Sequence, residues 1–253
     1  MSENISSNVL FHFTGSMGKL KSILKNGFYP RYCAEYTLDP ADRRAAYKSS
    51  HPMRAAPMVC FCDLPLSLIL KHLKAYGPFG IGLTKQWGLR NRVTPVIYTH
   101  PEAPTSRAIL HLTTTLAKSA DMTALNDSAL LGAYTKPYRG FAWRHRRSKR
   151  KVRFYDEREW RYVPVARELK SLLLGWPDYA RSAEMDARHE LFSRNYALPI
   201  TPDDITYLIV PYKRDERHLL HLAEYVSKLY KRVSAQVAVT TAIMTDDCLK
   251  GDV

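Results

Sequence analysis

The chain is 253 residues long, and its contents of 45% hydrophobic and 25% charged residues are those of a globular protein with a sizeable core. Lysine and arginine number 38 against 24 aspartate and glutamate residues, so the formal net charge is +14, which indicates a polyanionic partner, nucleic acid ahead of an anionic membrane surface. The sequence contains neither a run of about 18 apolar residues nor a signal-peptide pattern, so we expect no membrane span and a cytoplasmic location.

The predicted elements begin with a strand, a helix and a turn. Residues 8–14 are apolar and aromatic, and the segment after them has helical spacing and the stop signal Gly27. Residues 29–56 are polar and indicate an irregular or weakly helical excursion, and residues 166–200 indicate an insertion with helical pieces. Elsewhere we expect strands over 57–65, 77–88, 94–100, 154–165, 204–212 and 235–243, and helices over 65–76, 106–131 and 214–233. The pattern is neither alternating βαβ nor all-β, so it predicts an α+β fold with a mostly antiparallel or mixed sheet.

The positive charge is concentrated in one stretch. Residues 136–153, "KPYRGFAWRHRRSKRKVR", hold nine Lys or Arg and no acidic residue, and we expect a basic loop there. Arginines contact phosphates, and the interleaved rings of Phe141 and Trp143 offer stacking surfaces for unpaired bases. A solvated loop, or a docking surface for an acidic antitoxin, would use the same charges. The candidate nucleic-acid-binding residues are Arg139, Trp143, Arg144, Arg146, Arg147, Lys149, Arg150 and Lys151.

The four cysteines give no sign of a metal centre or a disulfide framework. Cys60 and Cys62 alternate along an apolar run and would point to opposite faces of a strand, while Cys33 and Cys248 are distant from both in sequence. We therefore expect no metal and a reducing compartment.

Two of the predicted strands carry side chains suited to chemistry. His12 stands between two phenylalanines, with Thr14 on its own face, and a packed core histidine is the plainer interpretation. In "FYDEREWRYVP" Glu157 and Glu159 lie two positions apart and, in a strand, would share a face with Arg161. These carboxylates could pair with basic residues on an exposed strand face, which is the simpler interpretation. Alternatively, they could belong to a catalytic cleft.

Four segments, in order, resemble the AbiGi family of bacterial abortive-infection phage-resistance proteins: "LFHFTGSMGKLKSILKNGFYPRYC", "VCFCDLPLSLILKHLKAYGPFGIGLTKQWG", "EREWRYVP" and "ITYLIVPYKR". More distantly, the His-x-Thr strand, the helix that ends in glycine and the late glutamate resemble proteins with the ADP-ribosyltransferase fold. That resemblance implies a single domain over 1–253 in which two small, mostly antiparallel sheets with peripheral helices enclose an NAD+ cleft. The resemblance covers most of residues 9–100 and 152–213, is weak over residues 101–151 and is absent from the 166–200 insertion.

The resemblance also implies roles for individual residues. His12 would bind the adenosine ribose, and Thr14 would contact the nicotinamide side. Glu159 matches the catalytic glutamate, which would polarise the nicotinamide ribose 2′-hydroxyl and stabilise an oxocarbenium-like transition state. The other candidate cofactor-binding residues are Tyr76, Phe79 and Arg161.

These last three residues have alternative roles. Tyr76 and Phe79 could stack on nicotinamide, although packing in the core is the plainer interpretation. Arg161 could bind the pyrophosphate of NAD+ or neutralise the neighbouring carboxylates, and the sequence does not separate the two.

We therefore expect an NAD+-dependent mono-ADP-ribosyltransferase toxin of a phage-defence or toxin–antitoxin system, with NAD+ as co-substrate. The basic run just ahead of Glu159 would bring a polyanion to the cleft, which favours RNA over DNA or protein as the substrate. The alternative is a non-enzymatic antitoxin or nucleic-acid-binding protein that keeps the fold without the activity, since the first motif is His-Phe-Thr in place of His-Gly-Ser. A metal-independent nuclease that uses His12 would need a second histidine nearby, and the sequence indicates no obvious one.

Overall fold

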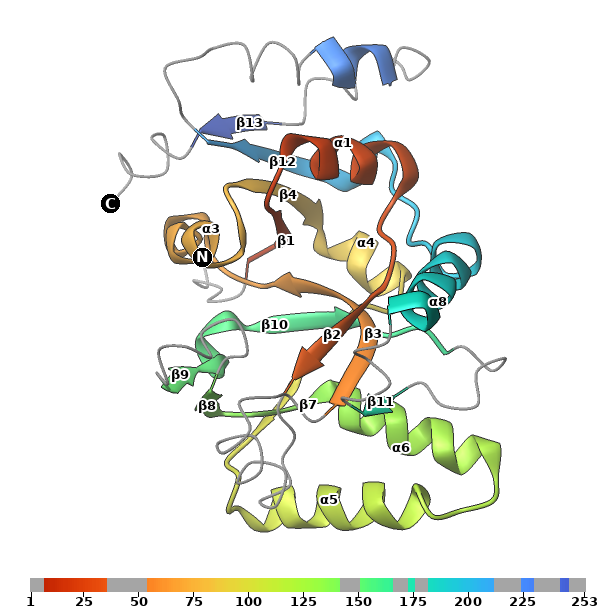
Figure 1. The fold of residues 1–253 in the computed structure, drawn as a ribbon. Coiled ribbons are helices and arrows are strands. Elements are labelled where there is room, and N and C mark those ends of the chain that lie inside the picture. Colours follow the sequence, from red (N-terminus) through yellow and green to blue (C-terminus); the bar gives the residue numbers. More distant parts are fainter. Residues whose placement is uncertain are drawn as a thin grey trace. The chain divides into compact units, whose positions relative to one another are not determined.

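The chain forms two compact units that interleave in sequence (Figure 1). The computed structural model describes residues 7–35, 54–141, 151–165, 173–175, 182–211, 224–229 and 242–245. Unit one comprises Met1–Tyr29, Cys60–Thr94 and Ala197–Val253, and unit two comprises Pro30–Val59 and Pro95–Tyr196. Both units mix helices with mostly antiparallel strands, which confirms the α+β class. A single domain over the whole chain stays a prediction.

Unit one is built on one sheet. Its described strands are β1 (Val9–Thr14), the last three residues of β3 (Arg54–Cys62), β4 (Phe79–Thr84), β12 (Ile205–Val210) and β13 (Ala242–Thr245). They lie in the hydrogen-bonded order β13-β12-β4-β1-β3, and all these pairs are antiparallel except the parallel pair of β12 and β13. The strand predicted over 204–212 is therefore confirmed as β12, and the one predicted over 8–14 as β1.

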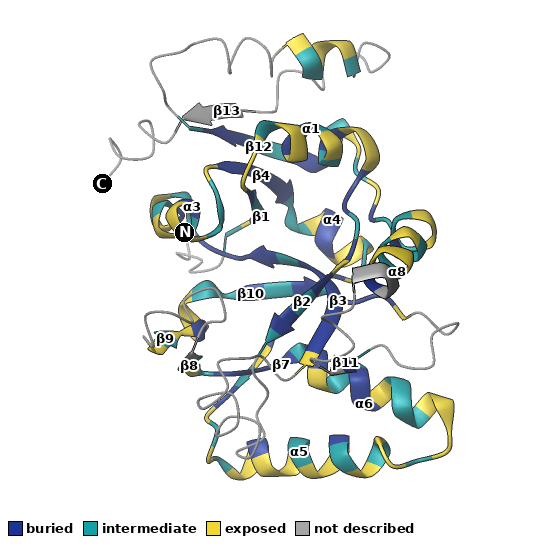
Figure 2. Ribbon diagram, viewed as in Figure 1, coloured by how far each residue is buried: buried dark blue, intermediate teal, exposed yellow. Residues whose placement is uncertain are grey.

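The core of unit one is apolar and aromatic. Side chains alternate along β1, so Phe11 packs into a cluster with residues of β12 and of the segment after β3. Gly82 of β4 makes room for this packing, because a Cβ there would lie 2.9 Å from the Phe11 ring. Figure 2 shows β1, β4 and β12 mostly buried. The buried members of the cluster are Val9, Phe11, Cys62, Leu64, Ile69, Leu73 and Ile209.

The first helix of unit one ends at the glycine that the sequence predicts as its stop signal, and it begins after a serine cap. The Ser16 side chain accepts a hydrogen bond from the Lys19 amide at the start of α1 (Met17–Asn26). Gly27 ends the helix with φ 76°, and its N–H donates to the Ile23 carbonyl. Only glycine fits this position, because a Cβ would collide with the Leu198 carbonyl oxygen.

Two expectations for unit one need correction. The helix expected over 65–76 is divided into a 3-10 turn, η1 (Leu66–Leu68), and α3 (Leu70–Tyr76). The strand expected over 77–88 ends at Thr84, whose hydroxyl caps α4 (Lys85–Arg90). The unit also contains η4 (Pro202–Asp204) and helical residues 224–229. The remainder of the elements predicted over 214–233 and 235–243 lies outside the described residues.

Unit two contains several short ladders. β2 (Arg31–Glu35) pairs antiparallel with Arg54–Met58 of β3, and β11 (Leu174–Gly175) pairs with the start of β3. β6 (Ile97–Thr99) pairs in parallel with β7 (Thr135–Pro137), and β8 (Arg139–Phe141) forms an antiparallel hairpin with β9 (Lys151–Arg153). The remaining strands are β10 (Glu159–Tyr162) and β5 (Thr94–Pro95), which lies at the boundary between the units.

The connection between β6 and β7 is an antiparallel pair of helices, α5 (Pro104–Leu116) and α6 (Met122–Tyr134) (Figure 1). The helix expected over 106–131 is thus two helices, and the Asp121 side chain caps the second by accepting from the Thr123 amide. The insertion expected at 166–200 contains α8 (Ser182–Asn195). Among the described helices, none combines the length and the apolarity that crossing a bilayer requires.

The strand predicted over 154–165 is wrong in its first half. Phe154–Glu157 form a 3-10 turn, η3, and Arg158 adopts the left-handed conformation with φ 43° and ψ 51°. β10 begins only at Glu159, so Glu157 and Glu159 are not neighbours on one strand face. The strand β2 corrects a second expectation, because residues 31–35 were assigned to an irregular excursion.

Candidate functional site

Glu159 is the centre of a buried ionic cluster in unit two. It starts β10, its residue is only 6% exposed, and both of its carboxylate oxygens are paired. Arg161, two residues further on the same strand face, donates from Nε to Oε1 at 2.7 Å and from Nη2 to Oε2 at 3.0 Å. Lys136 of β7 donates to Oε2 at 2.7 Å. The geometry therefore favours the second role considered for Arg161, which is to neutralise carboxylates.

The ammonium group of Lys136 forms ion pairs with three carboxylates. Its Nζ lies 2.7 Å from Glu159, 2.8 Å from Glu157 and 3.4 Å from Glu35 of β2. The ammonium also lies 4.6 Å from the centre of the Phe154 ring, which adds a cation–π contact. The 3-10 turn η3 thus brings Glu157 to the same cation as Glu159 although the two do not share a strand.

Arg161 completes the cluster from the other side. Its side chain is fully buried, donates from Nη2 to Glu35 at 2.7 Å and from Nη1 to the Ala133 carbonyl at the end of α6. The cluster therefore contains three carboxylates and two cations, which leaves one negative charge in excess when all five groups are ionised. Glu35 is its most exposed carboxylate, with 29% of its side chain accessible.

The neighbouring charges keep Glu159 and Lys136 charged at neutral pH. Burial alone would raise the pKa of Glu159, but the adjacent Arg161 and Lys136 more than reverse that effect and hold the pKa well below its usual range. Burial alone would lower the pKa of Lys136, but Glu159, Glu35 and Glu157 raise it well above the usual value. The opposite charges therefore favour the charged forms of Glu159 and Lys136, and these two groups are ionised between mildly acidic and alkaline pH.

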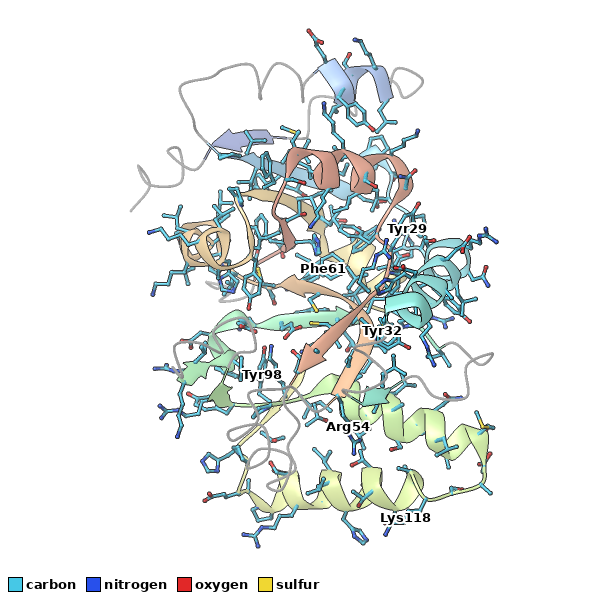
Figure 3. The ribbon with its side chains drawn as sticks, in the orientation of Figure 1. Tyr29, Tyr32, Arg54, Phe61, Tyr98 and Lys118 are labelled. Atoms are coloured by element: carbon cyan, nitrogen blue, oxygen red, sulfur yellow. The ribbon has the colours of Figure 1, made fainter. Side chains whose placement is uncertain are left out.

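A small pocket of about 80 Å³ opens beside the cluster within unit two. It lies between the β2–β3 ladder and the α5–α6 pair, and Figure 3 shows Arg54 there at the start of β3. Glu35 links the pocket to the ionic cluster because it lines the former and pairs with Arg161 and Lys136 in the latter. Cys33 also lines the pocket, and burial raises the pKa of its thiol to about 12, so it stays protonated.

A hydrogen bond of Tyr98 in β6 connects the start of β10 to the β6–β7 ladder. The Tyr98 hydroxyl accepts a hydrogen bond from the Glu159 amide at 2.9 Å, and Tyr98 is the register partner of Lys136. The Val96 amide donates to the Glu159 carbonyl. Burial raises the pKa of the Tyr98 phenol, so it remains neutral in this role. Figure 3 marks Tyr98 near β10 and the β8–β9 hairpin.

The candidate residues of unit one form a separate group around β1. His12 is half-buried; its Nδ1 lies 2.8 Å from the Cys60 carbonyl, and its ring packs against Phe28 and Phe61. Thr14 is buried and is the register partner of Phe79. Phe79 is buried as well, whereas half-buried Tyr76 stacks on the His72 ring. His12 and Glu159 belong to different units, so their approach around NAD+ stays a prediction.

Two of the predicted nucleic-acid-binding residues, Arg139 and Lys151, lie on the arms of the β8–β9 hairpin and are exposed. Arg139 is directly opposite Arg153, and the Phe141 backbone pairs with Lys151. The described parts of the predicted basic loop therefore include the paired strands β8 and β9. The other six residues, Trp143, Arg144, Arg146, Arg147, Lys149 and Arg150, lie outside the described residues.

Sequence reasoning missed two members of the cluster, Glu35 and Lys136, and the neighbouring Tyr98. Glu35 could have been found from the alternation in "RYCAE", which places Cys33 and Glu35 on one face and the buried Tyr32 and Ala34 on the other. Lys136 was counted as the first charge of the basic loop, and no local signal separates it from the rest. Tyr98 acts through its hydroxyl, a tertiary contact that periodicity does not reveal. Among the described residues, no group of three or more His, Cys, Asp or Glu could hold a metal ion.

The structure thus defines an α+β protein with a buried ionic cluster beside a pocket and a basic hairpin close in sequence. The model of the family described as "Putative abortive phage resistance protein AbiGi, antitoxin" matches residues 26–211. The chain therefore belongs to the AbiGi family of abortive phage resistance proteins. It is 27% identical over 209 residues to the "Abortive phage resistance protein AbiGi" of Lactococcus lactis subsp. cremoris, covering 72% of this chain and 82% of that protein. No solved structure matches the chain, so the ADP-ribosyltransferase fold stays a prediction.

Proposed function

We propose that this protein serves abortive phage defence by binding nucleic acid through the basic β8–β9 hairpin. The observation that carries the proposal is the pairing of Arg139 with Arg153 directly across the hairpin, both exposed. Like charges opposite one another destabilise a strand pair by roughly 0.2–1 kcal/mol, and a bound polyanion removes that repulsion. The hairpin belongs to a stretch of nine basic residues without an acid.

The word "antitoxin" in the family description also agrees with the proposal. An antitoxin acts by holding a partner or a nucleic acid, and neither task requires an open catalytic centre. The pairing of both Glu159 oxygens with buried cations agrees with such a role, because a carboxylate held in this way is already satisfied.

Neutralising the hairpin tests the proposal. The variant Arg139→Gln, Lys151→Gln, Arg153→Gln is expected to bind a labelled oligonucleotide more weakly and to reduce the slope of log Kd against log salt by about two to three, since each phosphate contact contributes roughly 0.7–0.9. A control with the same loss of charge replaces three exposed lysines, Lys71 and Lys74 of α3 and Lys118 just after α5. Equal weakening in the two variants would show that net charge, and not the hairpin, accounts for binding.

A second candidate function is NAD+-dependent ADP-ribosyl transfer, favoured by the excess negative charge beside the pocket. Cleavage of the glycosidic bond of NAD+ builds positive charge on the ribose, and fixed carboxylates nearby stabilise it. Glu159 is ionised at neutral pH, as such a role requires. Glu35 is the carboxylate that lines the pocket, so it would meet a ligand there before Glu159 does.

The size of the pocket limits how NAD+ would bind. Pockets for small molecules usually measure about 300–1,000 Å³, whereas this one measures about 80 Å³. The pocket of unit two therefore suits only one end of the dinucleotide, and His12 and Thr14 of unit one would have to supply the rest, as the resemblance implies.

Release of nicotinamide from NAD+ by the purified protein tests this second candidate. Glu35→Gln and Glu159→Gln are each expected to abolish turnover, and melting curves must show that the first variant keeps its fold. Glu35→Gln is the cleaner variant, because its partly exposed side chain costs less stability than the buried Glu159. Turnover that is unchanged in both variants, or absent in the wild type, would remove the candidate.

A further inference from the structure

Three tyrosines form an aromatic platform at the root of the basic hairpin, and we call Tyr98, Tyr138 and Tyr155 the tyrosine platform. Tyr138 precedes β8 and Tyr155 follows β9, so both flank the hairpin in sequence. The Tyr155 ring lies 5.5 Å from that of Tyr138 at an interplanar angle of 32° and 5.4 Å from that of Tyr98 at 78°. Such separations are those of interacting aromatic pairs.

The platform is held by backbone hydrogen bonds and leaves one ring accessible. The Tyr155 amide donates to the Tyr138 carbonyl at 3.3 Å, and the Tyr138 amide donates to the Thr99 carbonyl at 2.7 Å. Tyr98 is fixed by its hydrogen bond from the Glu159 amide. Tyr155 nevertheless stays 51% exposed, although two rings already support it. A large aromatic surface is therefore presented to solvent in a fixed orientation.

The charges around this ring suit a phosphate backbone. Arg139 is adjacent in sequence to Tyr138, and Arg153 lies two residues before Tyr155; both are exposed. Asp156 is the acidic neighbour, 3.6 Å from Arg153 and 62% exposed in its side chain. An exposed aromatic ring flanked by arginines is the arrangement that proteins use to stack an unpaired base while they contact the phosphates beside it.

We propose that the tyrosine platform stacks an unpaired base of single-stranded nucleic acid whose phosphates contact the β8–β9 hairpin. The inference rests on the proposed nucleic-acid binding and adds to it the class of ligand. A duplex offers no free base face, so it would use the hairpin charges but not the Tyr155 ring. The partner chemistry is that of an unpaired base next to phosphates, which single-stranded RNA and single-stranded DNA share.

The sharpest test compares a labelled single strand with an abasic strand of the same length, which keeps the phosphates and lacks the bases. By fluorescence anisotropy, the wild type is expected to bind the intact strand about tenfold more tightly than the abasic one, in line with stacking of one base. Tyr155→Ala is expected to lose that difference and to bind the abasic strand as the wild type does. Tyr155→Phe, which keeps the ring, is expected to retain the difference.

Two matched variants separate stacking from other effects. Leu112→Ala removes another large side chain that is 51% exposed, on α5, and is expected to leave binding unchanged. Asp156→Asn removes the acidic neighbour and is expected to strengthen binding of intact and abasic strands alike. RNA and DNA versions of the intact strand show which sugar the surface prefers, and duplex forms are expected to bind Tyr155→Ala and wild type equally.

The outcomes distinguish this inference from the function on which it rests. Equal binding of intact and abasic strands by the wild type, or equal weakening of both by Tyr155→Ala, would overturn the stacking role while leaving the hairpin as a polyanion site. Failure of the wild type to bind any oligonucleotide at low salt would overturn the proposed function and the inference together.

Discussion

The two units of the chain differ in what fills their interiors. In unit one, His12 of β1 packs against aromatic rings, and apolar side chains pack together on the sheet. In unit two the largest fully buried side chain on β10 is Arg161, and Lys136 is buried beside it. Apolar packing tolerates volume-conserving changes, whereas a buried ionic cluster fails when a single partner is removed. The stability of unit two therefore depends on a few named charges.

The largest expected effect is the loss of Arg161. Arg161→Met is expected to lower the free energy of unfolding by about 3–5 kcal/mol, because Glu159 and Glu35 lose their guanidinium partner in a buried site. Urea denaturation followed by circular dichroism measures the change.

Unit one supplies a control with similar geometry and different burial. Arg90 of α4 lies 2.6 Å from Asp204, but its side chain is 62% exposed. Arg90→Met is expected to cost less than about 1 kcal/mol, because its guanidinium is exposed and the buried Asp204 carboxylate keeps its hydrogen bonds from the Thr201 amide and hydroxyl. If the two substitutions proved equally costly, burial would not distinguish the units.

The next effect is the dependence of stability on pH. The pKa of Glu159 is depressed in the folded protein, so its contribution to stability is complete above the ordinary value of 4.5 and is lost as pH falls further. The pKa of Lys136 is raised, so its contribution is complete below 10.5 and is lost as pH rises through the folded value. With respect to these two groups, stability is level between about pH 5 and 10.

Comparison of the wild type with Glu159→Gln tests how far Glu159 accounts for the loss of stability at acidic pH. The wild type is expected to lose stability steeply as pH falls below 4.5, whereas the variant, already less stable at neutral pH, is expected to change less. Denaturation curves at pH 7, 5, 4 and 3 measure both slopes. Parallel slopes would mean that Glu159 is not the group whose protonation weakens the fold.

The local features of this chain were predictable because their signals lie within a few residues. The stop signal Gly27 ends α1 as the sequence predicts, and the aromatic run at 8–14 forms β1. The shared face of Glu159 and Arg161 also followed from strand periodicity, and their contact at 2.7 Å agrees with it.

The ionic cluster was not predictable because its partners come from distant segments. Glu35 and Arg161 are 126 positions apart in sequence. Their pairing depends on the β2–β3 ladder, and the polar composition of residues 29–56 gave no indication of that ladder. The place of Glu157 depends on the left-handed conformation of Arg158, which ends the 3-10 turn and restarts the chain as a strand. Periodicity cannot indicate such a break, so the segment was interpreted as one continuous strand.

The last comparison concerns two glycines, one in each unit. Gly82→Ala in β4 is expected to cost about 1–3 kcal/mol, because its Cβ would lie 2.9 Å from both the Phe11 ring and Val9 Cγ1 in a closely packed sheet. Gly132→Ala in α6 is expected to raise stability by about 0.5–1 kcal/mol, because its Cβ would meet only Leu173 Cδ1, at 3.7 Å, beside the pocket. Opposite signs in thermal melts would show that the sheet of unit one is closely packed at Gly82, whereas α6 of unit two has room for a methyl group at Gly132. A loss of stability in Gly132→Ala would mean instead that the space beside α6 is already filled.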